Sequence, residues 1–216
     1  MAFAKPAFIA FTGVDRPALR ADLERLSARY PIEWGILVDD DRKEPLFPAA
    51  DARMQLLSGP PLRWAAHICG TKAREIAATP DAAHLDLTGF QRVQINHSFQ
   101  GSAESHIANC ARFGKRAGVR AVLQCSGAFP PDLRVDWLFD VSFGKGTVPS
   151  AWPRLSEAGP FCGFSGGLNP HTIRNALEQI APPPDIPYWV DMESGIRTDG
   201  WLDVAKCEAV CRAVYD

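Results

Sequence analysis

Apolar residues along the chain fall into eight short runs, and most neighbouring runs are separated by a segment long enough for one helix. Apolar runs of this length are typical of strands that are buried on both faces of a parallel sheet. We therefore predict eight strands, at Phe8–Thr12, Ile32–Val38, Trp64–Cys69, Arg92–Asn96, Val119–Cys125, Val135–Asp140, Phe161–Ser165 and Tyr188–Glu193.

Several of the intervening segments carry apolar residues at helical spacing. The first begins near Asp15 and Pro17, ends at Pro31, and repeats its apolar positions every three to four residues. A second helix is predicted at 173–180, before a run of prolines, and a last one at Leu202–Val214. These helices are expected to cover the outer faces of the strands.

The connections after the fifth and sixth runs are weaker candidates for helices. Only about ten residues, including Pro130 and Pro131, separate Cys125 from Val135, which leaves room for about one helical turn. Eight strands that alternate with helices in roughly 200 residues indicate a closed parallel (β/α)8 barrel of the α/β class. No linker or shift in composition divides residues 1–216, so a single domain is predicted.

Composition and charge narrow the classes of partner. The 216 residues (23.6 kDa) are 46% hydrophobic, and 23 lysine and arginine residues nearly balance 25 aspartate and glutamate residues. No strong field of one sign favours nucleic acid or an anionic membrane, so the expected partner is a small molecule. The oligomeric state stays open between a monomer and a homodimer.

The start of the chain and its cysteines bear on localisation. Residues 1–13 contain an apolar stretch without the basic start and cleavage site of a signal peptide, and the stretch is too short to span a bilayer. It predicts a first strand. Six cysteines are scattered along the chain without a Cys-x-x-Cys pair, which predicts reduced thiols in the cytoplasm.

A glycine turn after the seventh strand is the strongest candidate binding motif. Gly166 and Gly167 allow the backbone to approach a ligand, Asn169 suits a helix N-cap, and Pro170 fits the first helical turn. Free amides at such a turn attract an anion, and the loops after strands seven and eight of a barrel commonly hold phosphate. Residues 194–195 supply the second turn, although both turns are also explained as plain tight turns.

An aspartate ends the sixth strand. Asp140 directly precedes the segment 142–147, which is rich in glycine and is expected to be a flexible loop that closes over the substrate. We predict Asp140 as a general acid, and the alternative is a cap on a nearby backbone turn. Lys145 in the loop is a candidate partner for a phosphate or carboxylate, or is simply solvated.

Two more carboxylates end the eighth strand. Strand alternation places Asp191 and Glu193 on one face together with Trp189. If that face is the barrel interior, the two carboxyl groups would have separated pKa values that suit acid and base roles. The alternative is that one of them holds Arg197 or Arg42 in an ion pair.

Histidine and cysteine near the ends of the third and fourth strands offer a possible metal site. His67 and Cys69 share a face, and His97 follows the fourth strand. A site of His67, His97 and a carboxylate is therefore considered, against the alternative that His67 and Cys69 face outward and pack against helices. Cys207 and Cys211, four residues apart in the last helix, are interpreted as packing residues.

Taken together, these landmarks resemble phosphoribosylanthranilate isomerase, the (β/α)8 barrel of the tryptophan pathway, over nearly the whole chain. The segment 165–170 matches the family's glycine-glycine-leucine-asparagine-proline phosphate turn, and 191–196 is similar to its last strand, aspartate-valine-serine-serine-glycine-valine. Residues 93–96 resemble the family's fourth strand. Asp140 and the segment 144–147 resemble its catalytic aspartate and the glycine-rich loop beyond it.

The resemblance implies an Amadori rearrangement of an aminoaldose to an aminoketose, without a cofactor, in which Asp140 protonates the ribose ring oxygen. The family's general base is a cysteine that ends the first strand, but Thr12 stands there in this chain, and a hydroxyl is a poor base near neutral pH. Glu193 and Cys69 are the substitutes that the sequence offers. The predicted substrate and phosphate ligands are Arg42, Gly146, Gly166, Gly167, Asn169, Asp191, Ser194 and Gly195.

Three hypotheses of function remain open. The first is an isomerase that acts on a phosphorylated sugar or aminosugar. The second is a barrel that keeps the phosphate pocket, has lost this chemistry and serves as a ligand-binding protein, which Thr12 favours. The third is a barrel enzyme of another reaction type, a lyase or hydrolase that uses Asp191, Glu193 and His67.

Overall fold

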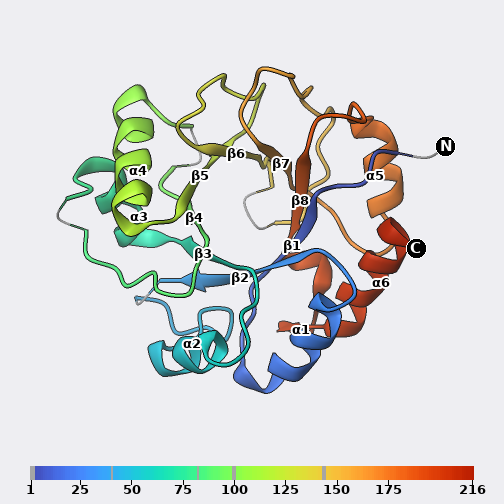
Figure 1. Cartoon of the computed structure of the whole chain (residues 1–216), viewed down its shortest axis with the longest axis horizontal. Coiled ribbons are helices and arrows are strands. Elements are labelled where there is room, and N and C mark those ends of the chain that lie inside the picture. The colour runs from blue at the N-terminus through green and yellow to red at the C-terminus, as the bar shows by residue number, and fades with distance from the viewer. Residues whose placement is uncertain (1–2, 40, 82, 99–100, 143–144) are drawn as a thin grey trace.

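The computed structural model describes residues 3–39, 41–81, 83–98, 101–142 and 145–216. Eight parallel strands pair in sequence order, and β8 pairs with β1, so that the sheet closes into the predicted barrel (Figure 1). The strands are β1 (Phe8–Thr12), β2 (Ile32–Val38), β3 (Trp64–Ile68), β4 (Arg92–Ile95), β5 (Arg120–Cys125), β6 (Asp136–Phe139), β7 (Cys162–Phe164) and β8 (Tyr188–Met192).

Five strands end one residue earlier than their apolar runs suggest. The residues beyond those ends are Cys69, Asn96, Asp140, Ser165 and Glu193. All five line the cavity described below, so their side chains leave the sheet just where the site begins. This placement agrees with the general rule that active sites of such barrels lie at the carboxyl ends of the strands.

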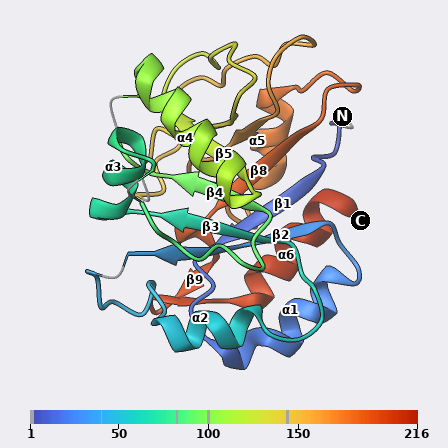
Figure 2. The same cartoon turned by 60° about the vertical axis from the view of Figure 1, so that its left-hand side comes forward.

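Helices surround the barrel on the outside, and α3 and α4 lie side by side on one flank (Figure 2). They are α1 (Arg20–Ser27), α2 (Ala50–Leu57), α3 (Gly70–Ala78), α4 (Glu104–Ala117), α5 (Ile173–Ile180) and α6 (Val204–Tyr215), with short 3-10 turns η1 (Pro17–Leu19) and η2 (Ser194–Ile196). The described residues between β5 and β6, and between β6 and β7, form no helix, as the short and proline-containing connection led us to expect for the first of these.

The last helix starts later than predicted. Leu202 does not begin it, because this residue lies in β10 (Trp201–Leu202), which pairs with β9 (Arg197–Thr198) in a small hairpin. Asp203 then caps α6, and its carboxylate accepts hydrogen bonds from the backbone amides of Ala205 and Lys206. The hairpin was not predicted, because two-residue strands carry no periodic signal.

The barrel interior is packed with apolar side chains, so it is a core rather than a pore. Trp189 stacks on Phe8 with 6.0 Å between ring centroids, inside a buried cluster that also contains Ala10, Val122 and Leu138. Gly163 on β7 makes room for the indole, since a Cβ atom there would lie 2.2 Å from Trp189 Cε2. Trp189 thus confirms that its face of β8 is the interior face.

Buried ion pairs close the amino-terminal end of the barrel. Arg92 Nη1 lies 2.9 Å from Glu33 Oε1, and Arg92 Nη2 lies 3.5 Å from Asp136 Oδ2. The Arg92 guanidinium also sits 4.1 Å from the centroid of the Trp189 ring. Active sites of such barrels lie at the carboxyl ends of the strands, so these buried pairs leave the opposite end of the barrel for a ligand.

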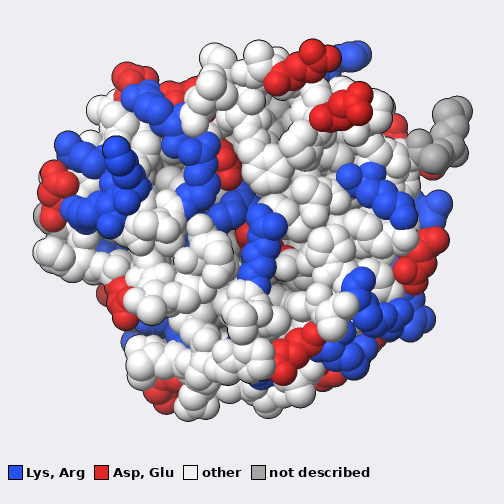
Figure 3. All heavy atoms as spheres, viewed as in Figure 1, with Lys and Arg blue, Asp and Glu red and all other residues white. Residues whose placement is uncertain are grey.

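The cysteines and the outer surface fit the composition. All six cysteines are free, and Cys207 and Cys211 are fully buried in the core between barrel and helices, which confirms them as packing residues. Basic and acidic side chains are interspersed over the face shown in Figure 3. Among the residues that the structure describes, no helix is both long and apolar enough to cross a membrane.

Candidate active site

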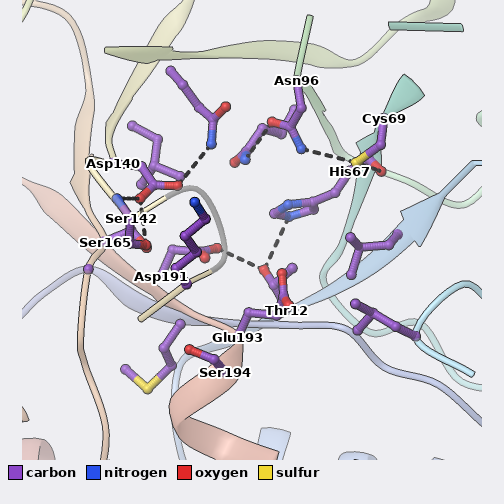
Figure 4. Close-up of a pocket in the computed structure, with 18 of the residues that line it drawn as sticks. Thr12, His67, Cys69, Asn96, Asp140, Ser142, Ser165, Asp191, Glu193 and Ser194 are labelled. Carbon is purple, nitrogen blue, oxygen red and sulfur yellow. Dashed lines mark hydrogen bonds between the residues drawn. The ribbon is translucent and has the colours of Figure 1, made fainter. Parts of the chain in front are cut away.

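A cavity of about 770 Å³ opens at the carboxyl ends of the strands (Figure 4). It is lined by residues that lie near the carboxyl ends of the strands or just beyond them, including His67 in β3. Of the twelve residues predicted to be catalytic or to bind the substrate or phosphate, ten belong to the lining: Thr12, Arg42, Cys69, Asp140, Gly146, Gly166, Gly167, Asp191, Glu193 and Ser194. Asn169 and Gly195 stand just outside the lining.

Three loops meet at the glycine-rich side of the cavity. Gly166 (φ +122°) and Gly167 (φ +63°) adopt left-handed backbone conformations, which favour glycine. A Cβ atom at Gly167 would lie 2.4 Å from Val148 Cγ2, and one at Gly146 would lie 2.8 Å from Ser194 Oγ. The loops after β6, β7 and β8 therefore pack so closely that side chains at these positions would push them apart.

Asn169 and Gly195 support these loops from behind. Asn169 Oδ1 accepts hydrogen bonds from the backbone amides of His171 (2.8 Å) and Thr172 (3.1 Å). The asparagine caps the turn before α5, although the helix itself begins only at Ile173. A Cβ atom at Gly195 would lie 2.0 Å from the Leu168 carbonyl oxygen, so glycine is required where the η2 turn touches the β7 turn.

Asp140 lines the cavity, as the prediction of a general acid requires, and it also caps its own turn, which was the alternative role. Its Oδ1 atom accepts hydrogen bonds from the Ser142 amide and hydroxyl, each at 2.8 Å. Its Oδ2 atom accepts one from Gln124 Nε2 at 3.1 Å. Phe143 and Gly144, part of the loop predicted to close over the substrate, lie outside the described residues, whereas Lys145 lines the cavity.

Asp191 is joined to the neighbouring strand by a hydrogen bond. The Thr12 hydroxyl donates to Asp191 Oδ2 at 2.9 Å, and Thr12 Oγ1 also lies 3.4 Å from His67 Nε2 (Figure 4). Burial raises the pKa of the Asp191 carboxyl to about 8; the Thr12 hydrogen bond opposes this rise, and nearby carboxylates add to it. Burial, assisted by the positive charge of Arg92, lowers the pKa of His67 to about 3, so this imidazole is neutral.

Glu193 and Cys69, the substitutes for the missing base, both lie at the cavity wall. Burial raises the pKa of the Glu193 carboxyl. Burial also raises the pKa of the Cys69 thiol, against the opposing effect of Asn96, whose Nδ2 atom lies 3.4 Å from Cys69 Sγ. Cys69 is therefore a thiol rather than a thiolate near neutral pH.

The arginines considered as partners of the β8 carboxylates are paired elsewhere. Arg42 lies 2.6 Å from Glu44 in an exposed pair. Arg197 lies 2.7 Å from Asp15, whose carboxylate is fully buried. Asp15 also accepts a hydrogen bond from the backbone amide of Leu202, and Arg197 donates to the Gly13 carbonyl, so this clamp ties the loop after β1 to the hairpin after β8.

The histidines do not assemble the metal site that we considered. His67 and Cys69 do face the cavity, which settles their orientation. His97 also lines the cavity, but its Nε2 atom lies 2.9 Å from Ser102 Oγ and its ring packs on His106. Within the described part of the chain, no group of three or more His, Cys, Asp or Glu side chains is placed to hold a metal ion.

Three supporting residues were missed in the sequence. Gln124 and Ser142 hold Asp140, and Gly35 makes room between Thr12 and His67. The sequence did give a signal for Gln124 and Gly35. A glutamine in an apolar run is unusual, and a glycine inside a strand often marks a close approach of another group. The sequence alone did not say what approaches.

No protein-family model matches the chain. It is similar in sequence to the N-(5'-phosphoribosyl)anthranilate isomerases of Streptococcus pneumoniae strains Hungary19A-6 and TIGR4, with 28% identity over 126 residues. This match covers 56% of the chain and spans only 57% of the length of these curated relatives.

Solved structures show the same fold. A phosphoribosyl anthranilate isomerase in complex with reduced 1-(o-carboxyphenylamino)-1-deoxyribulose 5-phosphate has a TM-score of 0.60 at 14% identity, covering 95% of this chain and 97% of the other. A monomeric form of the dimeric phosphoribosylanthranilate isomerase from Thermotoga maritima has a TM-score of 0.62 at 15% identity, covering 96% and 98%. At such low identity these structures bear on the fold alone.

Proposed function

We propose, on the premise that the chain is a phosphoribosylanthranilate isomerase-like (β/α)8 barrel, that it binds a phosphorylated aminosugar and isomerises it from an aminoaldose to an aminoketose. The S. pneumoniae relatives are named as isomerases of phosphoribosylanthranilate, and one solved structure of the same fold holds a 5-phosphate ligand. Both observations favour a phosphorylated substrate for this cavity.

One observation carries the proposal: a single cavity combines the glycine turns with a fixed carboxyl group. The turns at Gly166, Gly167 and Ser194 offer backbone amides to a phosphate, as helix and turn starts do in other barrels. Asp140 lines the same cavity, and Gln124 and Ser142 fix its orientation. A sugar phosphate anchored on the turns would therefore present its ring to an oriented carboxyl group.

In the proposed reaction Asp140 is the general acid. It gives a proton to the ring oxygen of the sugar, and the ring opens to an iminium ion. Loss of a proton from the next sugar carbon and reprotonation then yield the aminoketose. Proton transfer by a positioned side chain contributes a factor of about 10²–10⁴ to the rate, so Asp140→Asn is expected to lose turnover by that factor.

Turnover of phosphoribosylanthranilate by the purified protein tests this function. We expect turnover by the wild type and, at matched concentration, a signal reduced as stated for Asp140→Asn. A wild-type signal no higher than that of Asp140→Asn would refute the isomerase.

Phosphate binding is tested separately, with inorganic phosphate in a calorimeter. Gly167→Ala places a side chain at φ +63° and against Val148. The resulting strain of about 1–2 kcal/mol is expected to weaken the binding of phosphate roughly tenfold or more. Gly118→Ala is the matched control, because Gly118 has φ +70° but faces open space at the end of α4. Equal affinity in both variants would argue against an anion at the β7 turn.

A second function is favoured by Thr12. This residue stands where the resembling family has its cysteine base, so the alternative function is binding of the sugar phosphate without its conversion. Binding of phosphate without turnover of phosphoribosylanthranilate would select this alternative. The single-domain organisation and the cytoplasmic localisation remain predictions.

A further inference from the structure

We propose that Asp191 accepts the proton that leaves the sugar carbon, and that Thr12 and His67 are positioning residues that hold its carboxylate. The catalytic role rests on the proposed function above. The hydrogen-bonded arrangement of the three side chains does not depend on it. Asp191 would thereby replace the cysteine that the resembling family uses at the end of its first strand.

The first argument is the geometry of neighbouring strands. β8 pairs with β1, with Asp191 opposite Ala10, and this register brings the Thr12 hydroxyl within 2.9 Å of Asp191 Oδ2. Both residues are buried, with 3% of Thr12 and 6% of Asp191 exposed, yet both line the cavity. The carboxylate is thus held at the wall beside the position where the family carries its base.

The second argument is that the strand between Thr12 and His67 is shaped for their contact. β2 lies between β1 and β3, and Gly35 pairs with Thr12 in the β1–β2 register. A Cβ atom at Gly35 would lie 2.7 Å from Thr12 Oγ1 and 2.9 Å from His67 Nε2. Any side chain at position 35 would therefore separate the two groups, so glycine allows them to meet across β2.

The third argument is electrostatic. His67 is a poor proton acceptor because burial keeps it neutral, and Cys69 is held in its thiol form. Burial strengthens the hold of Asp191 on a proton, and the negative charges of Asp140 just beyond β6, Glu193 beyond β8 and Glu33 on β2 add to this effect. A carboxyl group with a raised pKa is a stronger base than an ordinary one.

The Thr12 hydroxyl suits both protonation states of Asp191. It donates to Asp191 Oδ2 when the carboxylate is ionised, and its oxygen accepts a hydrogen bond once Asp191 is protonated. In that second state the Thr12 proton points toward His67 Nε2, 3.4 Å away. A neutral imidazole can serve as donor or acceptor, so His67 supports either direction of the hydrogen bonds.

The proton balance closes without a further reactant. Asp191 takes the proton from the carbon next to the iminium carbon. The electron pair of that C–H bond forms a carbon–carbon double bond, and the iminium pair returns to nitrogen. Asp191 then returns its proton to the former iminium carbon while the enol hydroxyl gives its proton to Asp140, which restores both carboxyl groups and leaves the aminoketose.

Infrared difference spectra between pH 6 and pH 10 test the arrangement without substrate. We expect a carbonyl band of a protonated carboxylic acid that disappears with a midpoint near pH 8 and is missing in Asp191→Asn. Thr12→Val removes the donor that stabilises the ionised form, so the midpoint should move upward, and Thr12→Ser should restore it. Identical bands in the wild type and Asp191→Asn, or a midpoint that ignores Thr12→Val, would overturn the arrangement.

The pH profile of kcat/KM for phosphoribosylanthranilate tests the catalytic role. A base must be ionised, so the wild-type value should rise with pH through about 8. Asp191→Asn should lower kcat by about 10²–10⁴. Thr12→Val should move the rise to higher pH with little change in KM, and Thr12→Ser should restore the wild-type profile.

The outcomes separate this inference from the proposed function. Turnover that Asp191→Asn retains, or activity that falls above pH 8, would overturn Asp191 as the base and leave the isomerase standing. A titrating band at Asp191 in a protein without any turnover would remove the isomerase and the base role together, while it confirms how Thr12 holds the carboxylate. If Asp191→Asn does not fold, the infrared midpoints and pH profiles of Thr12→Val and Thr12→Ser still test the inference.

Discussion

Replacing Asp191 with asparagine should make the stability of the barrel less dependent on pH. Burial raises the pKa of this carboxyl in the folded protein from its ordinary 3.8 to about 8. Between these values the folded chain keeps a proton that the unfolded chain releases. The contribution of this carboxyl to the stability of the wild type is therefore fully present below pH 3.8 and is lost as the pH rises toward 8. Asparagine, of nearly the same shape, has no proton to lose.

The size of the effect follows from one proton. A difference of one bound proton changes the free energy of unfolding by about 1.4 kcal/mol per pH unit. Between pH 5 and pH 8 the wild type should thus lose on the order of 4 kcal/mol relative to Asp191→Asn. Altered hydrogen bonding to Thr12 adds a difference in stability that does not depend on pH, so it does not change the slope of the stability difference against pH.

Urea denaturation at pH 5, 6, 7 and 8 measures the free energy of unfolding for both proteins. Asp86→Asn is a suitable control. Hydrogen bonds from Thr88 lower the pKa of the exposed Asp86 carboxyl, so it is ionised in both states above pH 5 and its substitution should give a flat difference. If the difference between wild type and Asp191→Asn were equally flat, the argument that burial holds a proton on Asp191 would be wrong.

Two further predictions concern stability away from the cavity. Gly163→Ala should lower the free energy of unfolding by about 1–3 kcal/mol or more, because the added Cβ atom overlaps the indole of Trp189. Gly127→Ala is the control, because a Cβ atom there has no neighbour within 4 Å and should have little effect. Chemical denaturation of both variants measures the difference. Asp15→Asn should lower the free energy of unfolding by about 3–5 kcal/mol, because it leaves Arg197 without its buried charged partner. A loss below about 1 kcal/mol in the same measurement would show that the clamp does not stabilise the barrel as argued.

An exposed ion pair provides the contrast for the buried one. Arg212 pairs with Glu208 four residues earlier on α6, with 60% of the Arg212 side chain exposed. Arg212→Gln should leave the free energy of unfolding nearly unchanged in the same denaturation experiment, because exposed pairs are screened by solvent.

The strands were predictable from sequence because both faces of each one are buried. Trp34 and Ile36, for example, face the helices, while Gly35 between them faces the site, and no residue of β2 is exposed to water. The resulting runs are mainly apolar and easy to recognise, even where a buried polar residue such as Glu33 lies within one. Their ends were harder to place, because residues such as Asp140 and Glu193 leave the sheet to line the cavity.

The contacts within the site were not predictable in the same way. Asp191 and Thr12 are 179 residues apart in the chain, and no local pattern reports which side chains two distant strands bring together. The sequence placed both residues at strand ends, and it assigned Thr12 a role by resemblance. Only the register of β8 on β1 shows that the hydroxyl is a hydrogen-bond donor to a neighbouring carboxylate.

The clamp formed by Asp15 has a consequence for how the barrel is made. Its partners Arg197 and Leu202 follow it by 182 and 187 residues, so a chain in the course of synthesis cannot complete the clamp until almost all strands have emerged. Contacts of such long range close large loops and are formed slowly. Until residue 202 joins it, the buried Asp15 carboxylate has only the adjacent Arg16 as a charged partner, which makes closure of the ring a late and cooperative step of folding.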